Sequence, residues 1–399
     1  MLSTRCVSTR PRIFAVRSSP SLLLRPFSPF FSPSSSLSLG PLPSPIRKMA
    51  TKSFKLLCLE NPLLDIQGAG DHAMLEKYGL KLNDTLLAEP HQMGLYDDLI
   101  QNRNAKLIPG GAAQNTARGA QYMLPPDSVW YIGCVGDDEY AKILREKCKE
   151  EGLHVEYRVD PTTPTGKCGV IITDHHRTMC THLAAANEYK LEHLLEPRIW
   201  SMVEATSVGF YVGGYHLTVC PPAAMALAKH AAETNKIFML SLSAGFIPQF
   251  FKEPLAEILP YCDFVFGNEN EAKTWAESQG RPSDISMQEC AKLMAKLPKV
   301  NTKRPRVVIV TQGTDPTIVA VAEAGKEEVE LKEYSVPVID KNLINDTNGA
   351  GDAFAGGFCA GVVQGDPLEV CIKKGQWLAR LSLQELGPAY PRPKQTYKA

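Results

Sequence analysis

The sequence predicts an α/β fold with a mostly parallel central sheet, helices on both of its faces and a small β-rich lid. Short apolar runs recur along the chain from Lys55, and amphipathic helical patterns separate several of them. Short buried strands that alternate with helices are typical of parallel βαβ units. Two stretches break this alternation, and they predict the lid.

The expected strands of the main sheet each lead into a polar or glycine-bearing turn. They are the runs 55–60, 129–136, 206–214, 236–243, 262–268 and 305–313, and helices are expected at 138–152, 223–235, 270–279 and 287–297. Ligands of parallel α/β sheets bind beyond the carboxyl ends of the strands, so these turns are the candidate site.

The lid is expected from two segments, about 65–106 and 160–186, within one folded domain at 49–399. Residues 168–183 read as a strand, a polar turn and a second strand, which is typical of a hairpin. Residues 65–106 have weaker βα character. We expect these pieces to form a small sheet over the mouth of the main sheet.

Charge divides the chain at about residue 48. Residues 1–48 hold six Arg, one Lys and no acidic residue, and they are rich in Ser and Pro. This composition suits a mitochondrial presequence, a disordered extension or sequence upstream of a true start at Met49. The remainder carries 36 basic and 43 acidic residues, a net charge of −7, which argues against nonspecific nucleic-acid binding.

Other compositional features indicate an intracellular protein. The eleven Cys form no C-x-x-C pair, which favours reduced thiols. No apolar run reaches the roughly 18–20 residues that cross a bilayer. We therefore expect a monomeric cytoplasmic protein with no membrane partner. Mitochondrial import directed by residues 1–48 is the alternative.

The tetrapeptide Gly-Ala-Gly-Asp occurs twice, ending at Asp71 and at Asp352. The first copy precedes an ordinary amphipathic turn, so Asp71 is most simply a helix N-cap. The second copy opens a helix rich in Gly and Ala. Its helix start offers the N–H groups of Gly349, Ala350 and Gly351 to an anion, with Asp352 beside that anion. The second copy is therefore the candidate chemical site.

Three further stretches fit a phosphoryl-transfer site, although each has an ordinary structural alternative. Gly110 and Gly111 precede a helix that carries Asn115, or they form only a turn. Asn61 and Asp65 follow the first strand, where Asp65 could bind vicinal hydroxyls or could be a turn residue. A third pair lies three apart at a helix start and suits Mg²⁺ held through its waters, or a helix cap: Asn268 and Glu271.

Several other sites are excluded by missing residues. No G-x-x-x-x-G-K-[ST] P-loop, G-x-S-x-G turn or H-E-x-x-H helix is present. Phe354 stands where a dinucleotide-binding fingerprint needs its third glycine, which disfavours a dinucleotide oxidoreductase.

The segments "GGAAQNTARGA" and "DTNGAGDAFAGG" resemble the two signature segments of the ribokinase-like (PfkB) carbohydrate and nucleoside kinases. Together with "CLENPLLDI", "YCDFVFGNENEA" and "VTQGTD", they make the chain similar to the eukaryotic members that phosphorylate adenosine. The resemblance runs from about Lys52 to Pro393. It implies transfer of the γ-phosphate of ATP, with Mg²⁺, to the 5′-hydroxyl of adenosine, giving AMP and ADP.

The resemblance also implies roles for individual residues. Asp352 would be the general base, and Gly349, Ala350 and Gly351 would form the anion hole. The nucleoside side would involve Asn61, Asp65, Gly110, Gly111 and Asn115, with Tyr215 and Phe250 near the adenine and Arg177 near the phosphates. The ATP side would involve Thr311, Gln312, Gly313, Asn348 and Gln376, and Asn268 and Glu271 would position Mg²⁺.

Three positions depart from the family pattern. Glu60 stands where many relatives have Gly, Ala112 where Ser is expected, and Gln376 where His is common. None of these changes removes a group that the chemistry needs. A sugar kinase of the same fold and a catalytically silent nucleoside-binding relative remain the alternatives.

Overall fold

The computed structural model describes residues 54–173 and 176–398. The expectations for residues 1–48, a targeting signal or an extension, lie outside the described residues.

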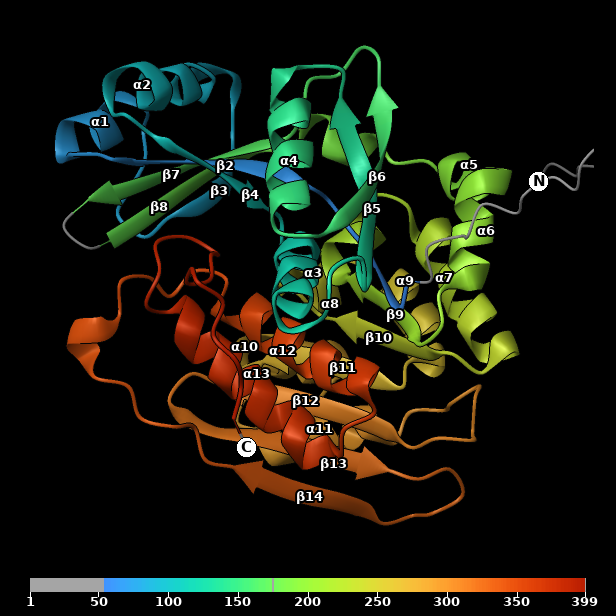
Figure 1. The fold of residues 1–399 in the computed structure, drawn as a ribbon. Coiled ribbons are helices and arrows are strands. Elements are labelled where there is room, and N and C mark those ends of the chain that lie inside the picture. The colour runs from blue at the N-terminus through green and yellow to red at the C-terminus, as the bar shows by residue number, and fades with distance from the viewer. Residues whose placement is uncertain (1–53, 174–175, 399) are drawn as a thin grey trace, which may run out of the picture. The chain divides into compact units, whose positions relative to one another are not determined.

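The main sheet has nine strands in the order β14-β13-β12-β11-β10-β9-β1-β5-β6 (Figure 1). Seven of them pair in parallel: β1 (Leu56–Leu59), β5 (Val129–Gly136), β6 (His154–Asp160), β9 (Gly209–Gly213), β10 (Ile237–Ser241), β11 (Phe264–Asn268) and β12 (Arg306–Gln312). The sequence predicts six of these strands, and the edge strand β6 was missed. Two antiparallel strands that the sequence patterns did not predict extend one edge: β13 (Asp315–Ala322) and β14 (Val329–Tyr334).

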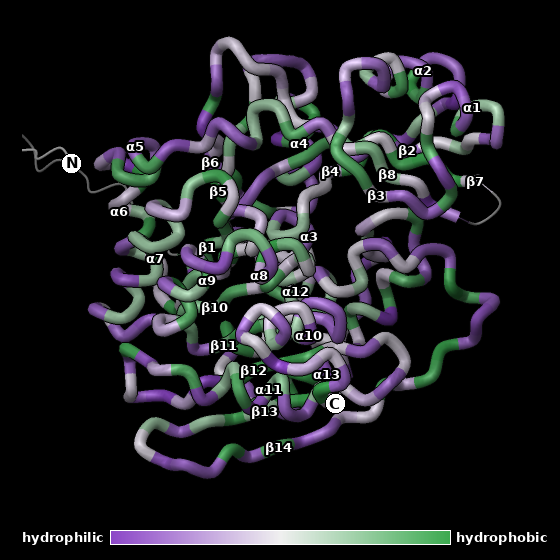
Figure 2. The backbone as a smooth tube through the Cα atoms, turned by 180° about the vertical axis from the view of Figure 1, so that it is seen from behind, coloured by the Kyte–Doolittle hydropathy of each residue, from purple (hydrophilic) through white to green (hydrophobic). Residues whose placement is uncertain are grey.

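Helices cover both faces of the main sheet because each strand alternates its side chains. Leu57 and Leu59 of β1 enter one core, whereas Leu56 and Cys58 enter the other. Figure 2 shows apolar stretches gathered around the central strands and hydrophilic stretches at the outer turns. The first core is completed by α6 (Pro197–Ala205), α7 (Pro221–Thr234), α9 (Lys252–Ile258), α10 (Glu269–Ser278) and α11 (Met287–Ala295). The second is completed by α3 (Ala112–Met123), α4 (Glu139–Glu150), α12 (Ala350–Gln364) and α13 (Leu368–Ser382).

A second, five-stranded sheet occupies the region predicted as a lid. Its strands are ordered β3 (Thr85–Leu87), β8 (His176–His182), β7 (Lys167–Thr173), β2 (Leu63–Ala69) and β4 (Lys106–Gly110). The strands β7 and β8 pair antiparallel, which confirms the hairpin. The helices α1 (His72–Lys77) and α2 (Leu95–Asn102) pack on one face of this sheet (Figure 1).

The chain passes between the two sheets at neighbouring points. It leaves the main sheet through residues 60–62 and returns through Gly110 and Gly111, because Leu63 and Gly110 pair in the register of β2 and β4. A Cβ atom at Gly111 would lie 2.3 Å from the carbonyl oxygen of Asn61, and Gly111 has a φ of 90°. Only glycine fits this close crossing, which places Asn61 beside the start of α3.

The remaining helical elements are short, and none of the helices described in residues 54–173 and 176–398 is long and apolar enough to cross a membrane. The cysteines of this described part are buried free thiols. The short elements are α5 (Leu191–Leu194), α8 (Phe246–Phe250), η1 (Pro90–Gln92), η2 (Ala184–Glu188), η3 (Gly214–Thr218), η4 (Leu259–Tyr261) and η5 (Lys341–Leu343).

Candidate active site

The second Gly-Ala-Gly-Asp copy forms an open turn at the start of α12. Gly349 is the N-cap and has a left-handed φ of 74°, a conformation that glycine adopts without strain. No side chain within the described residues caps this helix end. A Cβ atom at Gly351 would meet no described protein atom within 4 Å. The Cα of Gly351 therefore faces open space at the start of the helix, a place that suits an anion. The N–H of Ala350 donates a long bond of 3.4 Å to the oxygen of Thr347.

Asp352 lies in the first turn of α12, half-buried, with one oxygen held by a neighbouring helix. The side-chain amide of Asn115 in α3 donates a hydrogen bond of 3.0 Å to Asp352 Oδ2. Removal of the carboxyl group from water, with the nearby charge of Glu271, raises the pKa of Asp352 to about 7, against the lowering effect of the Asn115 bond. A carboxylate with a pKa near neutrality is suited to accept a proton.

The glycines of α12 allow α3 to approach closely enough for this contact. A Cβ atom at Gly356 would lie 2.8 Å from the backbone oxygen of Thr116 in α3. The helices therefore pack backbone to backbone, as the small residues of α12 predict. This packing brings Asn115 and Asp352 together.

The first Gly-Ala-Gly-Asp copy has a structural role, which confirms the prediction. Asp71 caps α1 by accepting a hydrogen bond of 2.8 Å from the N–H of Met74. Its other oxygen pairs with Arg103 at 2.8 Å.

The nucleoside-side residues predicted at the crossing lie close to one another. Asp65 is buried, and Gly110 is its close neighbour, since a Cβ atom there would lie 2.2 Å from Asp65 Oδ1. Burial raises the pKa of Asp65 to about 7, and the positive charge of Arg118 opposes that rise. The side-chain oxygen of Asn61 is buried without a hydrogen-bond partner among the described residues. Buried polar atoms normally have partners, so this oxygen is a candidate ligand contact.

Arg177 connects the small sheet to the glycine turn. Its side chain forms an ion pair with Asp346, which lies six residues before Asp352 and also accepts a 2.8 Å bond from the N–H of Asn348. The Nη1 atom of Arg177 is buried and has no partner among the described residues. This spare donor supports the predicted approach of Arg177 to phosphate.

Asn268 and Glu271 form a capping box at the start of α10. Asn268 Oδ1 accepts from the N–H of Glu271 at 2.9 Å, and Glu271 Oε2 accepts from the N–H of Asn268 at 3.0 Å. Burial raises the pKa of Glu271 to about 7. Within the described residues, no three His, Cys, Asp or Glu side chains gather as a metal site. One carboxylate and one amide suit an ion held mainly by phosphate and water, not an all-protein cage.

Of the residues predicted for ATP, Thr311 and Gly313 lie at the end of β12, whereas the side chains of Gln312 and Gln376 already have partners within the protein. Thr311 pairs with Asn268 in the register of β11 and β12, and Gly313 follows with open space around it. Gln312 instead donates to the oxygen of Pro316 at 2.6 Å. Gln376 is buried on α13, where its amide donates to Thr317 and to the backbone of Tyr334.

The two aromatic residues predicted near adenine have different surroundings. Tyr215, in η3, lies 5.9 Å from the ring of Phe246. Phe250 is 71% exposed at the end of α8. The structure thus adds Phe246 to this candidate surface.

Three buried charged residues near the site carried no predicted role. Glu60 accepts a 2.8 Å bond from the N–H of Ala113 at the start of α3, and burial raises its pKa to about 8. Arg118 lies three residues after Asn115 and therefore on the same face of the predicted helix. This spacing could have identified Arg118 as a neighbour of the site. Asp346 belongs to the second signature segment, but its partner Arg177 is distant in sequence.

Comparison with known proteins agrees with this fold and site. The pfkB family carbohydrate kinase model matches residues 72–395. The chain therefore belongs to this family, whose members carry out ATP-dependent phosphoryl transfer on a ribokinase-like fold.

Its relatives include enzymes of one substrate class. The adenosine kinase of Schizosaccharomyces pombe is 46% identical over 347 residues, which cover 86% of this chain and 98% of that protein. The structure of Anopheles gambiae adenosine kinase in complex with P1,P4-di(adenosine-5) tetraphosphate is 43% identical with a TM-score of 0.76, and the match covers 83% of this chain and 96% of that one. Adenosine kinase from Schistosoma mansoni, in complex with adenosine and AMP, is 32% identical with a TM-score of 0.75 over 86% and 98% of the two chains.

Proposed function

We propose that this protein transfers the γ-phosphate of ATP to the 5′-hydroxyl of adenosine, producing AMP and ADP in purine salvage. The observation that carries the proposal is the Asp352 carboxylate, held by Asn115 at the open end of α12. The similarity to adenosine kinases over most of the chain supports adenosine as the acceptor.

In this proposal, Asp352 accepts the proton of the 5′-hydroxyl while the oxygen attacks the terminal phosphate. The N–H groups of Gly349, Ala350 and Gly351 bind the transferring phosphoryl group. Asp65 and Asn61 accept hydrogen bonds from the ribose hydroxyls. Positioning and charge neutralisation account for most of the catalysis, because phosphoryl transfer needs little covalent help.

Mg²⁺ bound by ATP would neutralise phosphate charge, with Asn268 and Glu271 holding it through water. Closure of the small sheet over the site would exclude water and limit ATP hydrolysis. The supporting contact is the ion pair between Arg177 of β8 and Asp346 beside the glycine turn. A cytoplasmic location, with mitochondrial import as the alternative, and a monomeric state remain predictions.

The test is a substrate screen with ATP and Mg²⁺ that compares adenosine, ribose and fructose as acceptors. We expect AMP and ADP from adenosine, and much lower kcat/KM for the two sugars. Preferential phosphorylation of a sugar would replace the proposal with a sugar kinase. Adenosine binding by calorimetry without ADP formation would indicate a silent relative.

A further inference from the structure

Asn115 uses both ends of its side-chain amide within the protein. Its nitrogen donates to Asp352 Oδ2 at 3.0 Å, and its oxygen accepts from Arg118 Nη1 at 3.3 Å. An arginine side chain has donors and no acceptor. Arg118 can therefore contact only the oxygen of Asn115, which leaves the NH₂ group directed at Asp352.

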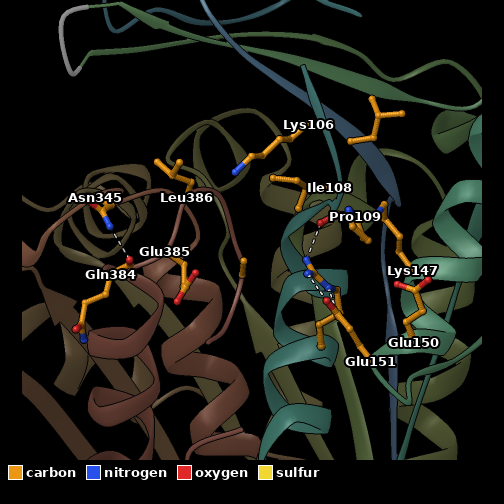
Figure 3. Close-up of a pocket in the computed structure, with 13 residues that line it drawn as sticks. Lys106, Ile108, Pro109, Lys147, Glu150, Glu151, Asn345, Gln384, Glu385 and Leu386 are labelled. Carbon is orange, nitrogen blue, oxygen red and sulfur yellow. Dashed lines mark hydrogen bonds and ion pairs between the residues drawn. The ribbon is translucent and has the colours of Figure 1, made fainter. Parts of the chain in front are cut away.

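Arg118 is itself fixed by partners from three other segments. Its Nε and Nη2 atoms form a two-point pair with Glu151, at 2.6 and 2.8 Å, after the end of α4. Its Nη1 atom also donates to the backbone oxygens of Pro109 at 2.6 Å and Pro388 at 2.9 Å. Because Nη1 has two hydrogens, the longer contact with the Asn115 oxygen shares one of them. Figure 3 shows the dashed contacts at Pro109 and Glu151 on the wall of a cavity of about 450 Å³. Arg118 is only 2% exposed, so its guanidinium has little freedom to move.

We propose that Arg118 is a positioning residue for the phosphoryl transfer, acting through Asn115 to hold the Asp352 carboxylate in its reactive orientation. This inference rests on the proposed function. It extends the site by a chain of contacts from Arg118 through Asn115 to Asp352. In this proposal, Arg118 acts on Asp352 only through Asn115.

The test compares Arg118→Met with Arg118→Lys and Glu151→Gln, using adenosine and ATP as substrates. We expect Arg118→Met to lower kcat by about tenfold or more, because small misplacements of reacting groups are costly, with the KM for ATP within about twofold of the wild type. The KM for adenosine should rise in this variant, because the lost charge no longer opposes protonation of Asp65; the charge-preserving Arg118→Lys should keep both KM values within about twofold. Arg118→Lys should lose kcat to a similar extent, since Glu151 and the Asn115 oxygen contact different nitrogens of the guanidinium, and the single lysine nitrogen cannot occupy both positions. Because lysine preserves the charge, this variant carries the test if Arg118→Met does not fold.

Glu151→Gln is the matched control for disruption of the buried pair. It should lower stability while kcat stays close to the wild-type value, because the Arg118–Asn115 bond remains. In an Asn115→Ala background, Arg118→Lys should produce no further loss of kcat.

Full kcat in Arg118→Lys, an equal kcat loss in Glu151→Gln, or a loss that is undiminished in the Asn115→Ala background would each overturn the inference. A change in KM alone would also do so. Wild-type protein that does not phosphorylate adenosine would instead refute the proposed function, so the two failures are distinguishable.

Discussion

Asp352 combines a pKa raised to about 7 with a side chain that remains partly open to solvent. The protonated form of Asp352 cannot accept the substrate proton, so activity should decrease as the pH falls. We expect kcat/KM for adenosine to fall as the pH decreases through about 7, approaching about tenfold per pH unit on the acid side. Asp65 and Glu271 have similarly raised pKa values, so the midpoint belongs to the coupled group. A kcat/KM for adenosine that does not change from pH 5 to 8 would contradict the assignment of Asp352 as the proton acceptor.

Residue roles were predictable where they depend on local sequence. The contrast between Asp71 and Asp352 followed from the residues after each copy, and the structure confirms the Asp71 cap. The capping box of Asn268 and Glu271 was the ordinary alternative for that pair. The orientation of Asn115 was not predictable, because it depends on α12, which lies more than two hundred residues away in sequence.

At the scale of elements, the glycines of α12 are of two kinds. Gly356 packs against the backbone of α3, whereas Gly351 faces open space. Gly356→Ala would place a methyl group against the backbone of α3 and should lower the free energy of unfolding by about 1–3 kcal/mol. Gly351→Ala should leave stability unchanged or raise it by up to about 1 kcal/mol. The same methyl group should reduce kcat, because it occupies the space assigned to the phosphoryl group.

Urea denaturation and steady-state kinetics of the two variants would measure these effects side by side. Equal destabilisation by both substitutions would show that the turn is packed like the rest of α12. Normal kcat in Gly351→Ala would remove this turn from the proposed anion hole.

At the scale of the whole described part, the Arg177–Asp346 pair connects the small sheet with the glycine turn before α12. Arg177→Met leaves Asp346 buried without its cation, and we expect a loss of up to about 3–5 kcal/mol in the free energy of unfolding. Asp346→Asn in the same chain is the matched control. It should restore part of that stability because it removes the unpaired charge. An Arg177→Met variant as stable as the wild type would show that the ion pair contributes nothing to the free energy of unfolding.

The parallel core of the fold was predictable because apolar strands and amphipathic helices alternate in the sequence. The small sheet was predictable only as an interruption of that pattern, since its strands pair across distant segments such as β2 and β7. The strands β6, β13 and β14 were missed. β6 and β14 are the two edge strands of the main sheet, and their half-buried and exposed residues give a weak burial pattern. β13 lies inside the sheet with a buried run at residues 317–320, and this apolar signal was available in the sequence.

The most direct measurement of the central claim is the turnover of Asp352→Asn, paired with calorimetric titration of adenosine. We expect kcat to fall on the order of 10²–10⁴-fold while adenosine affinity changes little, and Asp71→Asn to retain normal turnover. Near-normal kcat in Asp352→Asn would contradict the assignment of this carboxylate as the proton acceptor.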